Sequence, residues 1–254
     1  MDKKRTGLIA VFIIIMALGI ATIPGCRGSE VKIKGGPKDM QAIGPASEKS
    51  STKVEEVKLT VDYFLPDISK KYIFEGTVSS EGKLDSTVSW SMDNQGRYVK
   101  SEEINTTNKG SVYHSLYKDT FLVQKDSVYC TNRESYTEPF GTKTNRTIDG
   151  EWVMLKPVLP GEAWGSTYKE VSEYPQDFSK TTTFVGFEEI MIMGKKEQAA
   201  HLTVTYKSSN GVLYTYKEDY WLVRNIGVVK TIKEQSSRGY VDTEKSELTA
   251  IRSN

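Results

Sequence analysis

The sequence predicts an all-β protein: one large curved antiparallel sheet, as a half-barrel or barrel, after an N-terminal signal or anchor and a flexible tether. Three observations predict this fold class. From residue 58 onward, apolar and polar residues alternate in short runs, which is the period of a half-buried strand. Turn-rich spacers separate these runs. After residue 25, no stretch keeps the periodicity of an amphipathic helix.

Residues 1–25 are typical of an export signal. Lys3, Lys4 and Arg5 precede Thr6–Gly25, a run without any charged residue. A basic segment followed by an apolar segment marks a targeting sequence rather than part of a folded domain. A core helix would instead be amphipathic, whereas this run is apolar all round.

The end of this run, "IATIPGCRGS", resembles a bacterial lipoprotein signal. Ile23 matches the aliphatic position of that motif, Gly25 the small residue before the cut, and Cys26 the residue that receives lipid. The resemblance implies a lipidated Cys26. The alternative is an uncleaved anchor, because about 20 uncharged residues can span a bilayer as a helix. Either outcome tethers the chain by its N-terminus outside the cytoplasmic membrane.

Residues 26–57 form the predicted tether. The stretch is rich in Gly, Pro, Ser and Lys and has few large apolar residues. Such a composition cannot bury enough surface to offset the entropy lost on ordering. We therefore expect a flexible link that holds the following domain away from the membrane.

Residues 58–254 form one predicted β-rich domain outside the cytoplasm. The run "VKLTVDYF" alternates Val57, Leu59, Val61 and Tyr63 on one face, and similar runs follow as far as the C-terminus. The strongest hairpin signal is Asn210-Gly211, a pair that tolerates the positive φ angles of tight turns. About ten to twelve strands suit one curved antiparallel sheet. The other quoted runs are "KYIFEGTV", "STVSWSMD", "SVYHSLY", "TFLVQKDSVYC", "RESYTE", "GVVKTIKEQ" and "YVDTEKSELTAI".

Three landmarks in the second half carry a further resemblance. They are "LPGEAWGSTY", "EEIMIMGKKEQAAHLTVTY" and "DYWLVRNIGVVKTI". Their order and spacing resemble a group of uncharacterised bacterial lipoproteins with curved antiparallel sheets, similar in shape to lipoprotein-carrier half-barrels. The resemblance covers residues 158 to 235 and implies the fold more than an activity. Without it, Trp164 and Trp221 are interpreted as core residues and Gly227 as a bend between two strands.

Charge and cysteine content exclude some classes of function. The formal net charge is +1, and without residues 1–25 the chain has 31 basic and 32 acidic residues. This balance provides no electrostatic footprint for nucleic acid. With Cys26 lipidated, Cys130 has no partner for an internal disulfide, and no neighbouring base activates its thiol. We interpret Cys130 as a small core residue.

We find no catalytic constellation, metal site or cofactor motif. His114 and His201 are the two histidines, and each lies in a strand-like run without a second ligand at metal spacing. The acidic doublets Glu55-Glu56, Glu102-Glu103 and Glu188-Glu189 place neighbours on opposite faces of a strand. We interpret these carboxylates as solvated edges, and we expect the protein not to be an enzyme.

Aromatic residues give the one positive indication of a ligand. Tyr214, Tyr216 and Trp221 lie in one predicted hairpin region, where alternation places the two tyrosines on the same face. They are candidate contacts for an apolar or sugar ligand, because barrel mouths often hold ligands. The alternative is that these rings line the core while the hydroxyl groups reach solvent.

Three functions therefore remain open. The first is a non-enzymatic, lipid-anchored envelope protein that binds a hydrophobic ligand, an envelope polymer or a protein partner. The second is a hydrolase acting on envelope material, and the third is a structural lipoprotein without a small-molecule site. All three place the protein on the extracytoplasmic face of the bacterial cell membrane or on the outer membrane, in contact with the membrane through its N-terminal lipid.

Overall fold

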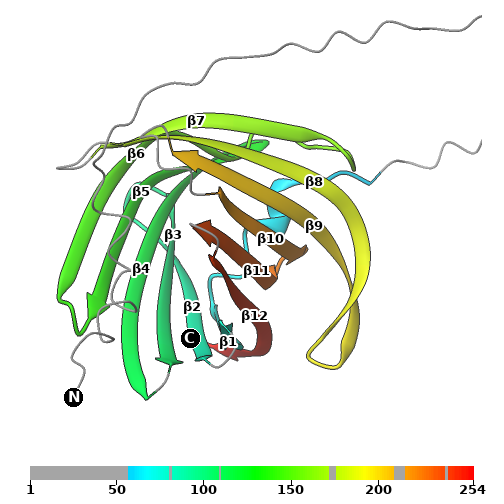
Figure 1. Cartoon of the computed structure of the whole chain (residues 1–254). Coiled ribbons are helices and arrows are strands. Elements are labelled where there is room, and N and C mark those ends of the chain that lie inside the picture. The colour runs from blue at the N-terminus through cyan, green and yellow to red at the C-terminus, as the bar shows by residue number, and fades with distance from the viewer. Residues whose placement is uncertain (1–56, 80–81, 109, 172–175, 209–214, 238–239) are drawn as a thin grey trace, which may run out of the picture.

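The computed structural model shows one closed antiparallel barrel of twelve strands (Figure 1), which confirms the predicted fold class and selects the barrel over the half-barrel. It describes residues 57–79, 82–108, 110–171, 176–208, 215–237 and 240–254. The proposed signal, most of the tether, Cys26, Tyr214 and the Asn210-Gly211 turn lie outside these residues. Within the described part, no helix is long and apolar enough to cross a bilayer.

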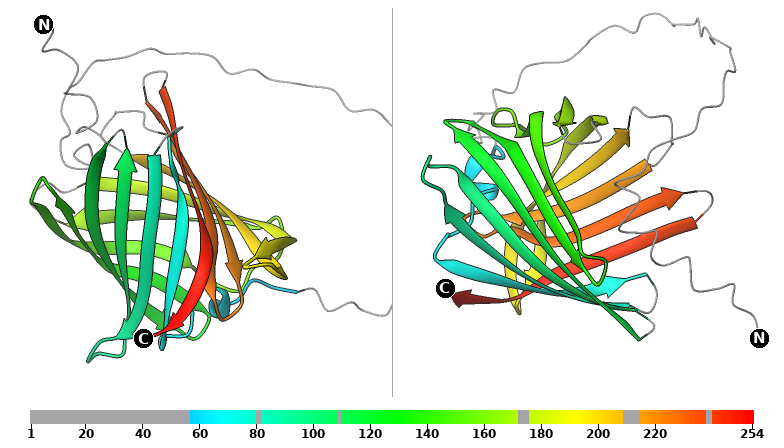
Figure 2. Two further views of the ribbon diagram at one scale, coloured as in Figure 1. Left: turned by 90° about the horizontal axis from the view of Figure 1, so that it is seen from below. Right: turned by 90° about the vertical axis from the view of Figure 1, so that its left-hand side faces the viewer.

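Each strand pairs with its neighbours in sequence, and β1 pairs with β12 to close the ring. Figure 2 shows the tilted strands from two further sides. The strands are β1 (Lys70–Val78), β2 (Gly82–Met92), β3 (Tyr98–Asn108), β4 (Ser111–Gln124), β5 (Ser127–Glu138), β6 (Thr142–Met154), β7 (Ala163–Val171), β8 (Gln176–Ile192), β9 (Lys195–Ser208), β10 (Thr215–Val223), β11 (Gly227–Ser237) and β12 (Tyr240–Ser253).

Two hairpins show how the sequence specifies the turns. Met193 and Gly194 connect β8 to β9 with φ angles of 48° and 74°. Glycine adopts this region without steric cost, so the chain reverses at Met193 and Gly194 within "EEIMIMGKKEQAAHLTVTY". Gly227 follows the turn between β10 and β11 with φ 83°, which agrees with its interpretation as a bend.

The N-terminal segment before β1 differs from the prediction. The alternation in "VKLTVDYF" predicts a strand, but the segment makes only the isolated bridge Leu59↔Val158 and then a 3-10 helix, η1 (Val61–Tyr63). Tertiary contacts override the alternation, because the Asp62 carbonyl accepts a hydrogen bond from the Asn225 amide at 2.8 Å. Leu59 and Tyr63 are consequently buried as a plug in one end of the barrel.

The plug completes the largest apolar cluster. Trp164 is 7% exposed and Phe184 is fully buried in this cluster, so the core interpretation of Trp164 is confirmed. The remaining buried members are Leu59, Tyr63, Val128, Met154, Val158, Ala200, Leu202 and Leu222.

Up-and-down topology defines two different barrel ends. The connections β2–β3, β4–β5, β6–β7, β8–β9 and β10–β11 share the end that holds the plug. The connections β1–β2, β3–β4, β5–β6, β7–β8, β9–β10 and β11–β12 share the opposite end. The chain enters β1 on the plugged side.

Candidate functional site: the charged barrel interior

A cluster of charged side chains faces the barrel interior, beyond the apolar plug. Strand register brings them together, because residues directly paired on neighbouring strands point to the same face. Lys100 pairs with Asp119, Asp119 pairs with Arg133, and Arg133 pairs with Arg146 across four consecutive strands. We call eleven of the charged residues on this face the lumen cluster: Lys100, Glu102, Asp119, Arg133, Arg146, Glu151, Glu170, Lys180, Glu218, Lys233 and Glu244. Asp242 shares the face of Glu244 on β12 but lies nearer the end opposite the plug, where it accepts a hydrogen bond from Ser79.

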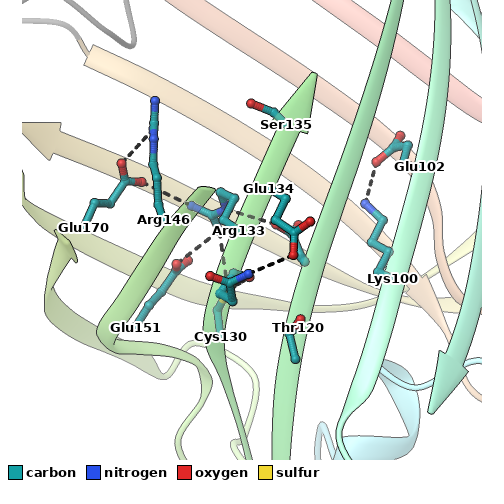
Figure 3. Close-up of polar contacts among 12 residues, drawn as sticks. Lys100, Glu102, Thr120, Cys130, Arg133, Glu134, Ser135, Arg146, Glu151 and Glu170 are labelled. Carbon is teal, nitrogen blue, oxygen red and sulfur yellow. Dashed lines mark hydrogen bonds and ion pairs between the residues drawn. The ribbon is translucent and has the colours of Figure 1, made fainter. Parts of the chain in front are cut away.

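Arg133 is the centre of one half of the lumen cluster (Figure 3). Its Nε lies 3.1 Å from Asp119 Oδ1, and its Nη2 donates to Glu151 Oε2 at 3.1 Å. Its Nη1 lies 3.6 Å from Glu170 Oε1. Because one guanidinium carries several donors in a planar fork, Arg133 can hold three carboxylates at once.

Two further cations complete this half. Arg146 Nη1 donates to Glu170 Oε2 at 2.7 Å, and Lys180 Nζ donates to Glu151 Oε1 at 3.0 Å. Glu151 is only 2% exposed and Lys180 only 8%. Three cations therefore balance three carboxylates, which is the condition for burying charge without a large penalty.

The other half contains two close pairs. Lys100 Nζ and Glu102 Oε2 are 2.6 Å apart, and Lys233 Nζ and Glu244 Oε1 are also 2.6 Å apart. Burial raises the pKa of Glu102, but Lys100 and Lys233 outweigh it and lower that pKa to about 2. Lys233 on β11 thus acts on Glu102 on β3, although β2, β1 and β12 lie between these strands in the ring. The charges of these two walls therefore act on each other across the barrel interior.

Water still reaches several of these side chains. Arg133, Lys100 and Lys233 face the interior, yet 30%, 28% and 26% of their side-chain surface is exposed. A tightly filled core would leave such groups no contact with solvent. The part of the barrel that holds the lumen cluster is therefore partly accessible to solvent, in contrast to the plugged end.

Glu218 has a different environment from the other carboxylates. Its Oε1 accepts a hydrogen bond from the Tyr216 hydroxyl at 2.8 Å, and its Oε2 accepts from Tyr206 at 3.1 Å and from Tyr220. Burial and then the Glu218 charge raise the pKa of the Tyr206 and Tyr220 hydroxyls. All three phenols consequently stay protonated and donate to the carboxylate.

Cys130 lies beside the lumen cluster but has no reactive character. It is 1% exposed. Burial is the largest influence on its thiol and raises the pKa to about 12, although the Arg133 charge opposes this change. A thiol with such a pKa is not a nucleophile at neutral pH, and its interpretation as a small core residue agrees with this environment.

The structure separates the predicted aromatic contacts. Tyr216 faces the lumen cluster, whereas Trp221 lies on the opposite face of β10, where it pairs with His201. The two rings stack at 4.5 Å between centroids, and Trp221 Nε1 donates to Glu188. Tyr216 and Trp221 therefore do not line one wall.

Sequence reasoning missed the lumen cluster. Glu102 was interpreted as a solvated edge together with Glu103, but Glu102 faces inward and accepts hydrogen bonds from Ser86 and Lys100. The available signal was the spacing of charges two residues apart, as in Lys100 and Glu102, which places both on one face of a strand. The pattern does not reveal that this face is the inner one.

The cavity and the two histidines outside the lumen cluster provide fewer groups for binding or catalysis. A cavity of about 350 Å³ at the β3–β4 and β5–β6 corner is lined by Val112, His114, Tyr136, Glu138, Pro139 and Gly141. Both His114 and His201 lie on strand faces opposite to the lumen cluster. In the part of the chain that the structure describes, no three His, Cys, Asp or Glu residues are grouped to hold a metal ion.

Among known proteins, this chain shows similarity to solved structures but not to any sequence family or curated protein. No family model matches the sequence, and no curated protein matches it. A protein described as a lipoprotein from Parabacteroides distasonis aligns at 11% identity with a TM-score of 0.41, over 75% of this chain and 98% of its own.

Two further solved structures align over similar lengths. A β-barrel-like protein with a domain of unknown function from Brucella abortus aligns at 9% identity with a TM-score of 0.46, over 75% of this chain and 99% of its own. A protein described as exported, with a YmcC-like fold, from Bacteroides fragilis aligns at 13% identity with a TM-score of 0.41, over 74% of this chain and 98% of its own.

Proposed function

We propose that this protein is a lipid-anchored, non-enzymatic protein of the bacterial envelope that binds a carbohydrate segment of an envelope polymer inside its barrel. The observation that carries the proposal is the lumen cluster and its partial accessibility to solvent. It presents alternating carboxylates and cations, with Tyr206, Tyr216 and Tyr220 on the same face. Sugar hydroxyls both donate and accept hydrogen bonds, so they suit a wall that alternates acceptors with donors.

A polar ligand suits this interior better than a hydrophobic one. The apolar part of the interior is already filled by the plug and by Phe184, Trp164 and Leu222. A fatty chain in the remaining half would strip water from charged groups without replacing their hydrogen bonds, which is costly. Of the ligand classes predicted from the sequence, an envelope polymer is therefore the one we retain.

The lumen cluster suits binding better than hydrolysis. A general acid near neutral pH needs a raised pKa, but cations hold the pKa values of Glu102 and Glu151 below the ordinary range. Neither histidine faces the lumen, so the base most often used in catalysis is missing from the described part of this face.

The topology gives the anchored protein an orientation. A tether from Cys26 would join the barrel at its plugged end, because β1 begins there. The opposite end would then point away from the membrane, toward polymer in the surrounding envelope. A lipid anchor with more than one acyl chain would hold this arrangement stably.

The lipid anchor is tested with Cys26→Ser in bacterial cells. We expect the variant to lose incorporation of radioactive palmitate, and either to leave the membrane fraction or to accumulate as an uncleaved precursor. Cys130→Ser is the matched control and should be labelled like the wild type. Equal labelling of Cys26→Ser and wild type would rule out Cys26 as the lipid site.

The binding proposal is tested by calorimetric titration of the full-length chain in detergent. The ligands are a glucosamine tetrasaccharide, its fully N-acetylated form and palmitate. We expect saturable binding of at least one sugar and weaker binding by Lys100→Gln, whose side chain faces the lumen. Lys118→Gln, on the opposite strand face, should bind like the wild type. Binding of palmitate alone, or of no ligand, would refute the proposal.

A further inference from the structure

The lumen cluster contains one carboxylate more than it contains cations. Five cations face six carboxylates, and five of these carboxylates have a lysine or arginine nitrogen within ion-pair distance. The exception is Glu218, which has no such partner among the described residues. Glu218 is nonetheless only 5% exposed. Keeping an ionised carboxylate there without a cation is costly.

The strand register explains why Glu218 lacks a cation. Lys233 on β11 lies directly between Glu218 on β10 and Glu244 on β12. One lysine therefore stands between two glutamates, and its ammonium bonds to Glu244 at 2.6 Å. The wall formed by β10, β11 and β12 consequently carries a negative charge that the Arg133 half does not carry.

Glu218 also retains an acceptor position. A carboxylate has about four lone-pair directions, and the three tyrosine hydroxyls occupy three of them, with Tyr216 alone on Oε1. The three tyrosines are themselves only partly buried, and their hydroxyl groups all point to the carboxylate. Tyr206 and Tyr216 lie 5.6 Å apart between ring centroids.

We infer that Glu218, with Tyr206, Tyr216 and Tyr220, is the subsite for a primary ammonium group on the ligand. This inference rests on the proposed binding function and specifies the chemistry of the ligand: an amino sugar, or another polymer unit with a free amine. The ammonium donates to Glu218 Oε1 and lies against the faces of the tyrosine rings, which attract cations. Lys180 Nζ already lies 5.7 Å from the Tyr206 ring centroid.

An organic ammonium fits this subsite better than a metal ion. A metal would need several oxygen or nitrogen ligands, yet the described residues provide one carboxylate here and no group of three His, Cys, Asp or Glu. The tyrosine hydroxyls direct their protons toward Glu218, so they do not present lone pairs to a cation bound at that carboxylate. An ammonium group instead brings its own protons for the free position.

The matched tetrasaccharides test this inference separately from the proposed function. They differ only in their amines, which are free in one and acetylated in the other, and the titrations are run at mildly acidic pH so that the free amines are protonated. In the full-length protein we expect the amine form to bind at least about tenfold more tightly, as for a charge-assisted hydrogen bond in a partly dehydrated site. Equal binding of both forms would leave the proposed function standing and overturn the ammonium subsite. Binding of neither form would overturn both.

Variants at the subsite locate the effect. Glu218→Gln should abolish the preference for the amine form, whereas Glu189→Gln, an exposed carboxylate paired with Lys196, should keep it. If Glu218→Gln fails to fold, the same two tetrasaccharides are titrated into Tyr216→Phe to test the ammonium subsite. It frees Glu218 Oε1 of its one hydroxyl donor, so we expect the preference for the amine form to be kept or increased. A lost preference in Tyr216→Phe, or an unchanged one in folded Glu218→Gln, would contradict the inference.

Discussion

Glu151→Gln will destabilise the barrel by about 3 to 5 kcal/mol at neutral pH, as expected when one partner of a buried ion pair is removed. Glu151 is 2% exposed and accepts from both Lys180 and Arg133. Arg133 keeps Asp119 and Glu170 in the variant. Lys180 does not keep a carboxylate within ion-pair distance among the described residues, so its ammonium stays buried without a counter-charge. Urea unfolding followed by tryptophan fluorescence measures the loss.

The pH dependence of the same measurement identifies the cause. Burial raises the pKa of Glu151, but Lys180 and then Arg133 outweigh it and lower that pKa below its ordinary value of 4.5. A carboxyl group with a depressed pKa in the folded state adds stability that is complete above its unfolded pKa. This stability disappears as the pH falls through the folded pKa. The gap between wild type and Glu151→Gln should therefore close below pH 4.5.

A double variant separates charge from packing. Glu151→Leu with Lys180→Met removes both charges together and should cost less than either single change, because no unpaired charge remains. Glu103→Gln, on the opposite strand face, is the matched control and should unfold like the wild type. If the double variant is destabilised by the sum of the losses in unfolding free energy of Glu151→Leu and Lys180→Met, the pair acts through packing and not through charge.

The fold could be predicted because its determinants are local. Alternation with a period of two specifies strands, and turn residues such as Gly194 and Gly227 specify where the chain reverses. Barrel closure could not be predicted in this way. It depends on pairing Lys70–Val78 with residues near the C-terminus, and no local pattern reveals which edge strands meet.

The lumen cluster could not be predicted for a related reason. Alternation shows that Glu102 and Glu103 face opposite sides of β3, but it does not show which side is inside. Polar residues are usually assumed to lie on the outside, and this barrel, whose interior is charged and partly accessible to solvent, reverses that assumption. The plug was missed because alternation in Val57–Tyr63 matches a strand, while the contacts that reshape it come from Val158 and Asn225, about a hundred or more residues away.

Gly76→Ala tests how closely the barrel depends on the seam between β1 and β12. Gly76 pairs with Ser246 on one side and with Leu84 on the other. A Cβ atom at this position would overlap the Lys245 carbonyl oxygen and lie 2.9 Å from the Ser246 Cα. Both neighbours are backbone atoms and cannot rotate away, so β12 must shift. We expect the free energy of unfolding to fall by about 3 kcal/mol, at the upper end of the range for overpacking substitutions.

The loss of stability should first affect β1 and β12, the two strands that close the barrel. Hydrogen exchange of the full-length chain should show faster exchange of the β1 and β12 amides in Gly76→Ala, with little change in β4 and β5. Thr77→Ala, an exposed neighbour on the same strand, should exchange like the wild type. An opened seam would also expose two strand edges, so the variant should aggregate more readily. If its exchange and unfolding matched those of the wild type, the seam at Gly76 would not be as close as the structure places it.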